Sequence, residues 1–240
     1  MQSFTSILNT ILYKNAAILG EYFEDLGRAD EAKKYKDIAL QLKSAIRAVL
    51  WNEDDSMWYD YNLKTNKHKR EFYPSNLFPL YGQAYHETIN ASRVLENIVS
   101  SGVTIFPGGL PTSLYNTTKQ PQQWDFPNVW PPLVEVFVTS MEELNLTESR
   151  EIGREIAEKY IRNVYASAQE NGTMFEKYDC EKVGKAGSGG EYGVQEGFGW
   201  SNGVSMSLLN KYPDMISSAS RTSSTIVIIT ITLCIFKAMY

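Results

Sequence analysis

Cysteine and histidine are scarce in this sequence, with two of each among 240 residues. Cys180 and Cys234 are too few for the disulfide framework of a small secreted domain, and their spacing matches no zinc site. His68 and His86 lie among polar neighbours in the sequence, which predicts surface positions rather than metal-ligand roles. We therefore expect neither a metal nor any other cofactor.

An excess of positive charge is also missing. Lys and Arg total 23 against 28 Asp and Glu, the net charge is -5, and no basic cluster stands out. Proteins that bind nucleic acid usually carry a basic patch, so we expect no nucleic-acid partner.

Long hydrophobic runs are absent as well. The apolar stretch from Thr225 to Phe236 is shorter than the roughly 20 residues of a membrane-spanning helix. With small residues at Ser217 to Ser220 before it, this stretch is typical of the signal for a glycolipid (GPI) anchor. A marginal membrane anchor and a tail without function are the alternatives. We expect a folded domain over 1–212 and membrane attachment through a tail over 213–240.

Aromatic residues are plentiful, at 12% of the chain, and several tryptophans and tyrosines stand beside polar residues. Rings next to fixed polar groups are typical of sugar sites, although an aromatic-rich core is an equal interpretation. No signal peptide is recognisable at the N-terminus. The sequence nevertheless has four N-x-S/T glycosylation sequons, at Asn90, Asn116, Asn145 and Asn171, which favour an extracellular or cell-surface glycoprotein.

The periodicity of apolar residues predicts an all-α fold. A first helix over 3–26 ends near Gly27, and Asp30 caps a second that runs to Val49, giving an αα-hairpin. A small β-hairpin follows, with strands near Met57–Tyr61 and Arg70–Phe72. Further helices are expected over 76–83, 87–100, 129–144, 147–168 and 201–211. Paired helices separated by long loops, at 101–128 and 170–198, indicate about half of an α/α toroid with a site on its loop-bearing rim.

The segment Gln122–Pro132 is rich in tryptophan and proline and predicts a rigid loop before a helix. Such a loop could present Trp124 as a platform for a sugar ring, with Gln123 and Asp125 as partners for hydroxyl groups. The competing interpretation is that Asp125 caps a turn and the tryptophans belong to the core.

Two further segments carry candidate carboxylates. Glu176 lies between aromatic residues, and an extended chain would point Lys177 to the opposite side. The alternative is a surface Glu–Lys pair. The glycine-rich stretch Gly184–Tyr192 could close over a ligand and present Glu191, or it could be a flexible linker.

Five segments, in this order, resemble those of trehalases: REFYPSN (70–76), GLPTSL (109–114), QWDFPNVWPP (123–132), MFEKYD (174–179) and GGEYGVQEGFGWSNG (189–203). The resemblance implies an (α/α)6 toroid, of which this chain is a part, and inverting hydrolysis of α,α-trehalose to two glucose molecules without a metal. It implies that Glu176 is the general base. It also implies that Glu191, Trp124, Asp125 and Gln123 contact the substrate.

The chain departs from this family in one serious respect. The family's general acid is an aspartate in a Gly-Trp-Asp-Phe-Ser-Ser-Arg-Trp segment, and no such segment occurs here. The family's Pro-Gly-Gly-Arg-Phe segment is missing too. We therefore expect negligible activity from this chain alone, and a non-catalytic carbohydrate-binding or regulatory protein is the alternative function.

Overall fold

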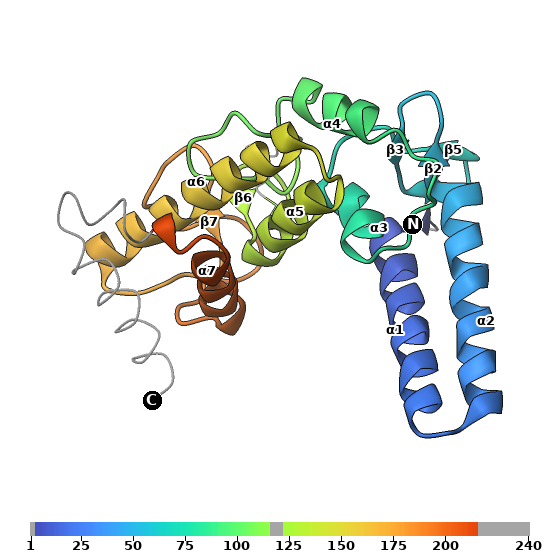
Figure 1. The fold of residues 1–240 in the computed structure, drawn as a ribbon. Coiled ribbons are helices and arrows are strands. Elements are labelled where there is room, and N and C mark those ends of the chain that lie inside the picture. Colours follow the sequence, from blue (N-terminus) through green and yellow to red (C-terminus); the bar gives the residue numbers. More distant parts are fainter. Residues whose placement is uncertain (1–2, 116–121, 216–240) are drawn as a thin grey trace. The chain divides into compact units, whose positions relative to one another are not determined.

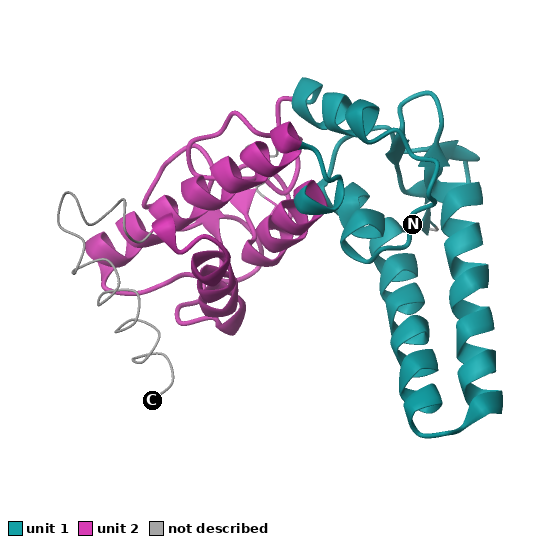
Figure 2. Ribbon diagram, in the orientation of Figure 1, with its two compact units in different colours: residues 1–101, 142–146 teal, residues 102–141, 147–240 magenta. Residues whose placement is uncertain are grey.

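The computed structural model describes residues 3–115 and 122–215, which form helices joined by short strands and irregular loops (Figure 1). The chain is divided into two compact units (Figure 2). Unit 1 comprises Met1–Ser101 and Glu142–Leu146, and unit 2 comprises Gly102–Met141 and Thr147–Tyr240. The part of the tail expected to attach to a membrane, from residue 216 onward, lies outside the described residues.

Unit 1 begins with the predicted αα-hairpin, formed by α1 (Ser6–Asp25) and α2 (Ala29–Ala45). Thr5 caps α1 by accepting a hydrogen bond from the amide of Leu8, and Gly27 makes the turn at φ 71°. The prediction that Asp30 caps the second helix is wrong. That helix already begins at Ala29, so Asp30 lies in its first turn, where a negative charge favours the positive end of the helix dipole.

Short strands follow the hairpin. A π-helical turn, Ile46–Leu50, leads into β2 (Trp51–Asn52), which pairs antiparallel with β3 (Met57–Trp58). A second sheet has the order β1 (Ser3–Phe4), β4 (Tyr61–Asn62) and β5 (Lys67–His68).

The predicted strand over Arg70–Phe72 is wrong. The Arg70 guanidinium instead forms an ion pair with Asp55, and the chain enters the 3-10 turn Pro74–Leu77 and the short helix α3 (Phe78–Tyr81). Helix α4 (Ala91–Ser100) completes this part of unit 1, and Asn90 caps it.

The surface position predicted for His86 is also wrong. His86 is buried, its ring meets the Trp51 ring edge-on at 5.1 Å between centroids, and burial lowers its pKa. His68 is half-buried, with Nε2 2.8 Å from the carbonyl oxygen of Val49. The polarity of sequence neighbours did not indicate these contacts, because the partners come from other elements.

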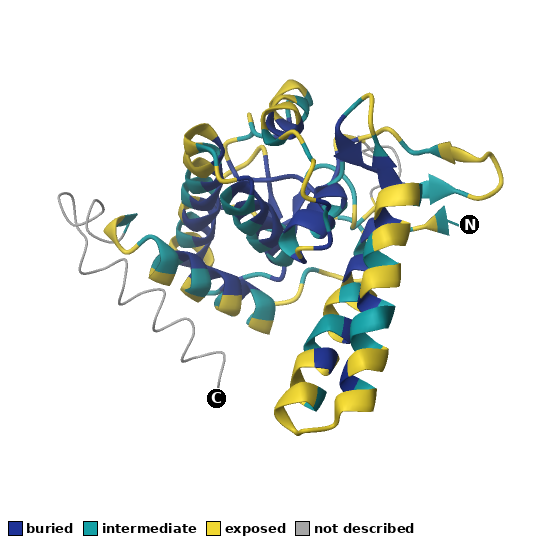
Figure 3. Cartoon of the chain, turned by 45° about the vertical axis from the view of Figure 1, so that its right-hand side comes forward, coloured by how far each residue is buried: buried dark blue, intermediate teal, exposed yellow. Residues whose placement is uncertain are grey.

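Unit 2 is built on α5 (Pro131–Glu143), α6 (Thr147–Asn171) and α7 (Gly199–Lys211). Helix α6 buries a face that includes Ile156, Tyr160 and Val164. Figure 3 colours the buried residues of the chain dark blue. Long loops precede α5 and α7 in the regions expected, and β6 (Asn128–Val129) in the first loop pairs with β7 (Tyr178–Asp179) in the second. Because Val129 belongs to this pair, α5 begins two residues later than predicted.

Candidate active site

Hydrogen bonds within residues 122–130 fix the part of the loop directly before α5 that the sequence predicts to be rigid. The indole Nε1 of Trp130 donates to the carbonyl oxygen of Gln123 at 2.7 Å. The side-chain amide of Asn128 donates to the carbonyl oxygens of Gln122 and Asp125, at 3.2 and 3.1 Å. These bonds close the loop on itself, so its side chains are held before any ligand arrives.

Asp125 is half-buried and has a clear structural contact. Its Oδ1 accepts a hydrogen bond from the hydroxyl of Ser113 at 3.0 Å, and the amide of Phe126 donates to the same hydroxyl oxygen. Ser113 belongs to the GLPTSL segment, so two segments of the resemblance meet here. The contact fits the interpretation of Asp125 as a turn-stabilising residue, and its role toward a substrate stays a prediction.

Aromatic rings connect the loop to the start of α7. Trp124 stacks on Trp130 with 3.9 Å between ring centroids and 8° between ring planes, and Trp130 meets Trp200 edge-on at 5.4 Å. Trp130 is fully buried, whereas Trp124 is 50% exposed. Trp124 is therefore supported by the buried Trp130 ring, while half of its own side chain stays exposed to solvent. This arrangement suits a platform for an apolar sugar face.

Glu176 is held by its backbone on both sides. Its amide donates to the carbonyl oxygen of Gln195 at 2.9 Å, and its carbonyl oxygen accepts from Nε1 of Trp200 at 2.8 Å. The residue is only 1% exposed, and Oε1 has no hydrogen-bond partner among the described residues. A buried carboxylate oxygen without a donor costs free energy, so such atoms often mark functional sites.

Lys177 bonds to backbone carbonyls of another segment, and no ion pair joins it to Glu176 among the described residues. That the two side chains point to opposite sides stays a prediction. The Nζ of Lys177 donates to the carbonyl oxygens of Ser188 and Gly189, at 3.2 and 3.0 Å, and lies 5.2 Å from the centre of the Trp130 ring. Both Glu176 and Lys177 are buried, so the interpretation as a surface Glu–Lys pair is wrong.

The glycine-rich segment is fixed by contacts with the loop before α5. The amide of Ser188 donates to Oδ1 of Asn128 at 2.8 Å. At Gly190, where φ is 95°, an added Cβ would lie 2.6 Å from Oε1 of Gln123. The flexible-linker interpretation is therefore wrong for this stretch. Glu191 follows directly and is exposed.

Sequence reasoning missed Glu135, which lies on α5. Its Oε1 accepts a hydrogen bond from the hydroxyl of Ser207 on α7 at 3.0 Å, while Oε2 is buried without a partner in the described part of the chain. A single carboxylate in the apolar run PPLVEVFV was a signal that could have identified it.

Unit 2 thus contains several buried acceptor oxygens that lack a donor within residues 102–115 and 122–215. They belong to Gln123, Glu135, Glu176 and Asn202. Two tryptophans connect two of these residues: Trp130 bonds the backbone of Gln123, Trp200 bonds that of Glu176, and the two indoles touch. Acceptors of this kind suit a ligand that carries many hydroxyl donors.

No group of three or more His, Cys, Asp or Glu residues in the described ranges could hold a metal ion. The expectation that the chemistry needs no cofactor stays a prediction. In the same ranges, no helix combines the length and the apolar character needed to cross a membrane.

Comparisons with known proteins identify the family of this chain. The family model for trehalase matches residues 4–213. The chain is 40% identical over 210 residues to the trehalase of Pimpla hypochondriaca, covering 86% of this chain and 35% of that protein. It is 36% identical over 214 residues to human trehalase, covering 89% and 36%. The chain thus spans about a third of the length of these relatives.

Solved structures show the same fold. The neutral trehalase of Saccharomyces cerevisiae superposes with a TM-score of 0.64 at 17% identity, over 88% of this chain and 38% of that one. A mannosylglycerate hydrolase from Thermus thermophilus superposes with a TM-score of 0.62 at 16% identity, over 87% and 45%. These likenesses confirm the predicted fold class, a mainly helical part of an (α/α)6 toroid. The family model that matches residues 4–213 and the 40% identity to a curated trehalase show that this chain belongs to the trehalase family of glycoside hydrolases.

Proposed function

We propose that this chain provides the water-activating carboxylate and part of a glucose subsite of an enzyme that hydrolyses α,α-trehalose with inversion. The observation that carries the proposal is the buried Oε1 of Glu176, which has no partner among the described residues while the backbone of Glu176 is held on both sides. A base prepared in this way needs a ligand or water to supply the missing donor.

The reaction requires a second carboxyl group. As Glu176 takes a proton from water, the water oxygen bonds to one anomeric carbon, the glycosidic bond breaks, and an acid protonates the departing bridging oxygen. In inverting glycosidases the two carboxyl groups stand about 6.5–9.5 Å apart, which leaves room for the water. Since no segment of this sequence matches the family's acid segment, we propose that the acid comes from outside these 240 residues.

The remaining residues are proposed to bind the sugar. Trp124 offers its half-exposed ring to an apolar sugar face, and Gln123 offers the free acceptor Oε1 to a hydroxyl group. Glu191 and Asp125 are proposed to contact further hydroxyls, with Asp125 also bonded to Ser113.

The isolated chain is expected to have negligible trehalase activity, because loss of a general acid alone removes about 10²–10⁴-fold of rate. Glucose release from trehalose by the purified chain measures this directly. Turnover equal to that of a full-length relative would contradict the proposal that the acid lies elsewhere. Calorimetric binding of trehalose, with no hydrolysis in any longer form, would instead favour a carbohydrate-binding or regulatory protein.

The role of Glu176 is testable in a chimera that joins the upstream region of the Pimpla hypochondriaca trehalase to this chain. Glu176→Gln keeps the side chain's size but removes the base, so kcat should fall by about 10²–10⁴-fold. Glu181→Gln, at an exposed position five residues away, is the matched control and should retain the starting rate. A similar kcat for both variants would contradict the assignment of Glu176 as the general base.

Stereochemistry tests the inverting mechanism in the same chimera. Inversion yields one β-glucose from the attacked ring and one α-glucose from the leaving group, so early NMR spectra should show the two anomers in equal amounts. An initial product of α-glucose alone would mean retention of configuration.

We also propose an extracellular or cell-surface location, with glycosylation and with attachment through the tail. The asparagines of the described sequons, Asn90, Asn145 and Asn171, are all exposed, which supports the first part of this proposal. The sequon at Asn116 and the tail from residue 216 lie outside the described residues. A mass shift after enzymatic removal of N-glycans, and release from cells by phosphatidylinositol-specific phospholipase C, would test the two parts separately.

A further inference from the structure

Lys177 is a fully buried cation whose bonds go to backbone carbonyls rather than to a carboxylate. It is 0% exposed, and its Nζ donates to the carbonyl oxygens of Ser188 and Gly189. Burial lowers the pKa of its ammonium group, and the charge of Glu176 opposes that shift. Burying a lysine is costly, so its retention calls for a specific role.

The carbonyls that Lys177 binds belong to the glycine-rich segment Gly187–Gly190. The backbone of Lys177 holds the same segment, because its carbonyl oxygen accepts from the amide of Gly187 at 3.0 Å. The contact is close: a Cβ added at Gly187 would lie 2.9 Å from Cγ of Lys177. Both the main chain and the side chain of Lys177 therefore fix this segment.

On its other side, Lys177 lies over the indole of Trp130. The Nζ atom is 5.2 Å from the ring centre, within the range of a cation–π contact, and Trp124 stacks on the same indole. Lys177 thus contacts both the ring that supports Trp124 and the segment that leads to Glu191.

We propose that Lys177 is a positioning residue that holds the segment Gly187–Gly190 against the loop before α5 and thereby fixes Glu191 and Trp124 for the substrate. It acts through those two residues and does not touch the substrate itself. The substrate part of this inference rests on the proposed function.

The chemistry of the segment explains why a long cationic side chain is needed. Four residues, Gly187, Ser188, Gly189 and Gly190, offer almost no side-chain surface to pack, so backbone hydrogen bonds must hold them. An ammonium group has three donors and can serve two carbonyls at once, whereas an apolar side chain of the same length would leave both unpaired.

Hydrogen exchange of the whole chain tests the positioning role without any substrate. Lys177→Met keeps the length and removes the donors, so amides of 187–191 should exchange about tenfold faster or more, as expected when hydrogen bonds to a charged group are lost. Amides of α6 should exchange at the starting rate. Lys182→Met is the matched control, because Lys182 is an exposed lysine in the same loop, and it should change neither region.

Two results would overturn the proposal. One is an exchange rate at 187–191 that equals that of Lys182→Met. The other is an equal acceleration in α6, which would mean a general structural role. If Lys177→Met does not fold, Lys177→Gln keeps an amide donor and should show a smaller, still local acceleration.

Trehalose binding tests the consequence for the substrate. In calorimetry, Lys177→Met should weaken trehalose binding by about tenfold relative to Lys182→Met, in step with the loss of order at 187–191. Faster local exchange with unchanged affinity would overturn the link to Glu191 and Trp124. If the unmodified chain binds no trehalose, the same variants are compared in the chimera with the Pimpla hypochondriaca upstream region. If that chimera binds no trehalose either, the proposed function fails, and the exchange data alone decide whether Lys177 holds the segment.

Discussion

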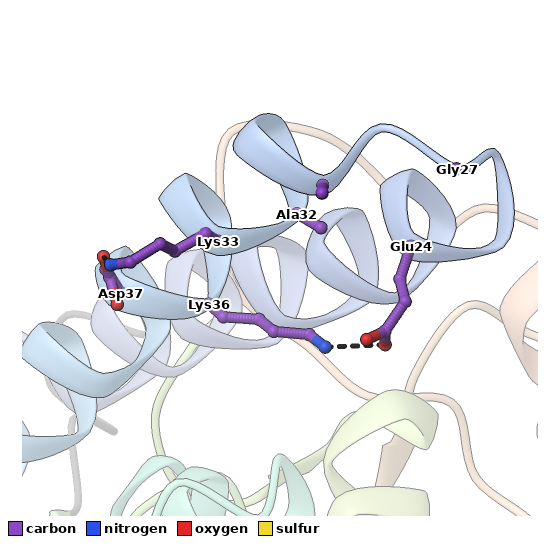
Figure 4. Close-up of a pocket in the computed structure, with 7 residues that line it drawn as sticks. Glu24, Gly27, Ala32, Lys33, Lys36 and Asp37 are labelled. Carbon is purple, nitrogen blue, oxygen red and sulfur yellow. Dashed lines mark hydrogen bonds and ion pairs between the residues drawn. The ribbon is translucent and has the colours of Figure 1, made fainter.

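The αα-hairpin of unit 1 and the loops of unit 2 are stabilised in different ways. In the hairpin, α1 and α2 satisfy their own backbone groups, and their charged side chains pair at the surface, as Lys36 does with Glu24 (Figure 4). In unit 2, loops without regular structure are held by buried side chains that bond distant backbone groups. Asn163 is the clearest example, since its amide joins three separate positions of the chain.

The pocket on the hairpin illustrates the same difference. It is open, with a volume of about 380 Å³, and the charged residues that line it include two ion pairs, Lys36–Glu24 and Lys33–Asp37 (Figure 4). In unit 2, buried carboxylate and amide oxygens lack donors within the described residues, whereas the buried unpaired atoms of the hairpin are the hydroxyl oxygens of Ser6 and Thr10. The size of a pocket therefore says less about function here than the unpaired polar atoms do.

The comparison predicts its largest effect at Asn163, which is fully buried on α6. Its Nδ2 donates to the carbonyl oxygens of Gly108 and Asp179, at 2.8 and 2.9 Å, and its Oδ1 accepts from the amide of Gly184 at 2.7 Å. Asn163→Ala leaves all three groups unpaired, so the free energy of unfolding should fall by about 3 kcal/mol or more. Urea unfolding followed by tryptophan fluorescence measures the loss.

The control for this variant is Asn210→Ala, an exposed substitution on α7 that should change the free energy of unfolding by less than about 0.5 kcal/mol. Equal effects at the two sites would contradict the view that buried polar side chains hold the loops of unit 2.

A smaller, pH-dependent effect is expected in unit 1 at Asp55. The hydrogen bond from Arg70 holds the pKa of this carboxyl below its usual value of about 4. Because the folded-state pKa is the lower one, the pair contributes stability above about pH 4, and this contribution is lost as the pH falls toward the folded-state pKa. Thermal unfolding between pH 6 and pH 2 should show this loss.

Asp55→Asn removes the titrating group and should flatten the acid end of that stability profile. If the stability of Asp55→Asn falls with pH as steeply as that of the unmodified chain, other carboxylates cause the acid sensitivity.

The smallest effect is expected at Lys36, whose Nζ lies 2.6 Å from Oε2 of Glu24 on the neighbouring helix. Lys36→Met keeps the apolar stem and removes the charge, and exposed pairs contribute about 0–1 kcal/mol. The free energy of unfolding should therefore change by less than about 1 kcal/mol, and the difference should shrink in 0.5 M NaCl. A larger loss that persists at high salt would mean that a buried side-chain contact, like those in unit 2, also stabilises the hairpin.

The regular parts of the fold could be predicted from the sequence, because helical periodicity is a local property. It gave the αα-hairpin and the helices that became α4, α5, α6 and α7. Strands of two residues, such as β5 at Lys67–His68, carry too little pattern to locate. The burial of His86 and the π-helical turn after α2 depend on packing between distant elements, which local patterns do not report.

The candidate site could be predicted only in part. Trp124 and Glu176 stood out as residues. The stacking of Trp124 on Trp130 lies within one segment but needs a specific loop conformation, and the bond from Trp200 to Glu176 joins residues 24 positions apart. Lys177 was expected to point away from Glu176, and the sequence could not show that it would bind the carbonyls of Ser188 and Gly189. Glu135 was missed because its partner, Ser207, lies 72 positions later.

The unpaired acceptor oxygens of unit 2 have a consequence for inhibitor design. A compound designed for the proposed site should bring hydrogen-bond donors, because each acceptor that stays buried and unpaired costs about 1–3 kcal/mol of affinity. Methyl ethers of a sugar lose the O–H donor and keep only the acceptor oxygen. They are therefore expected to bind more weakly than their added volume alone would explain. A sugar mimic with a protonated amine near Glu176 would supply both a donor and a compensating charge, and is the better starting scaffold.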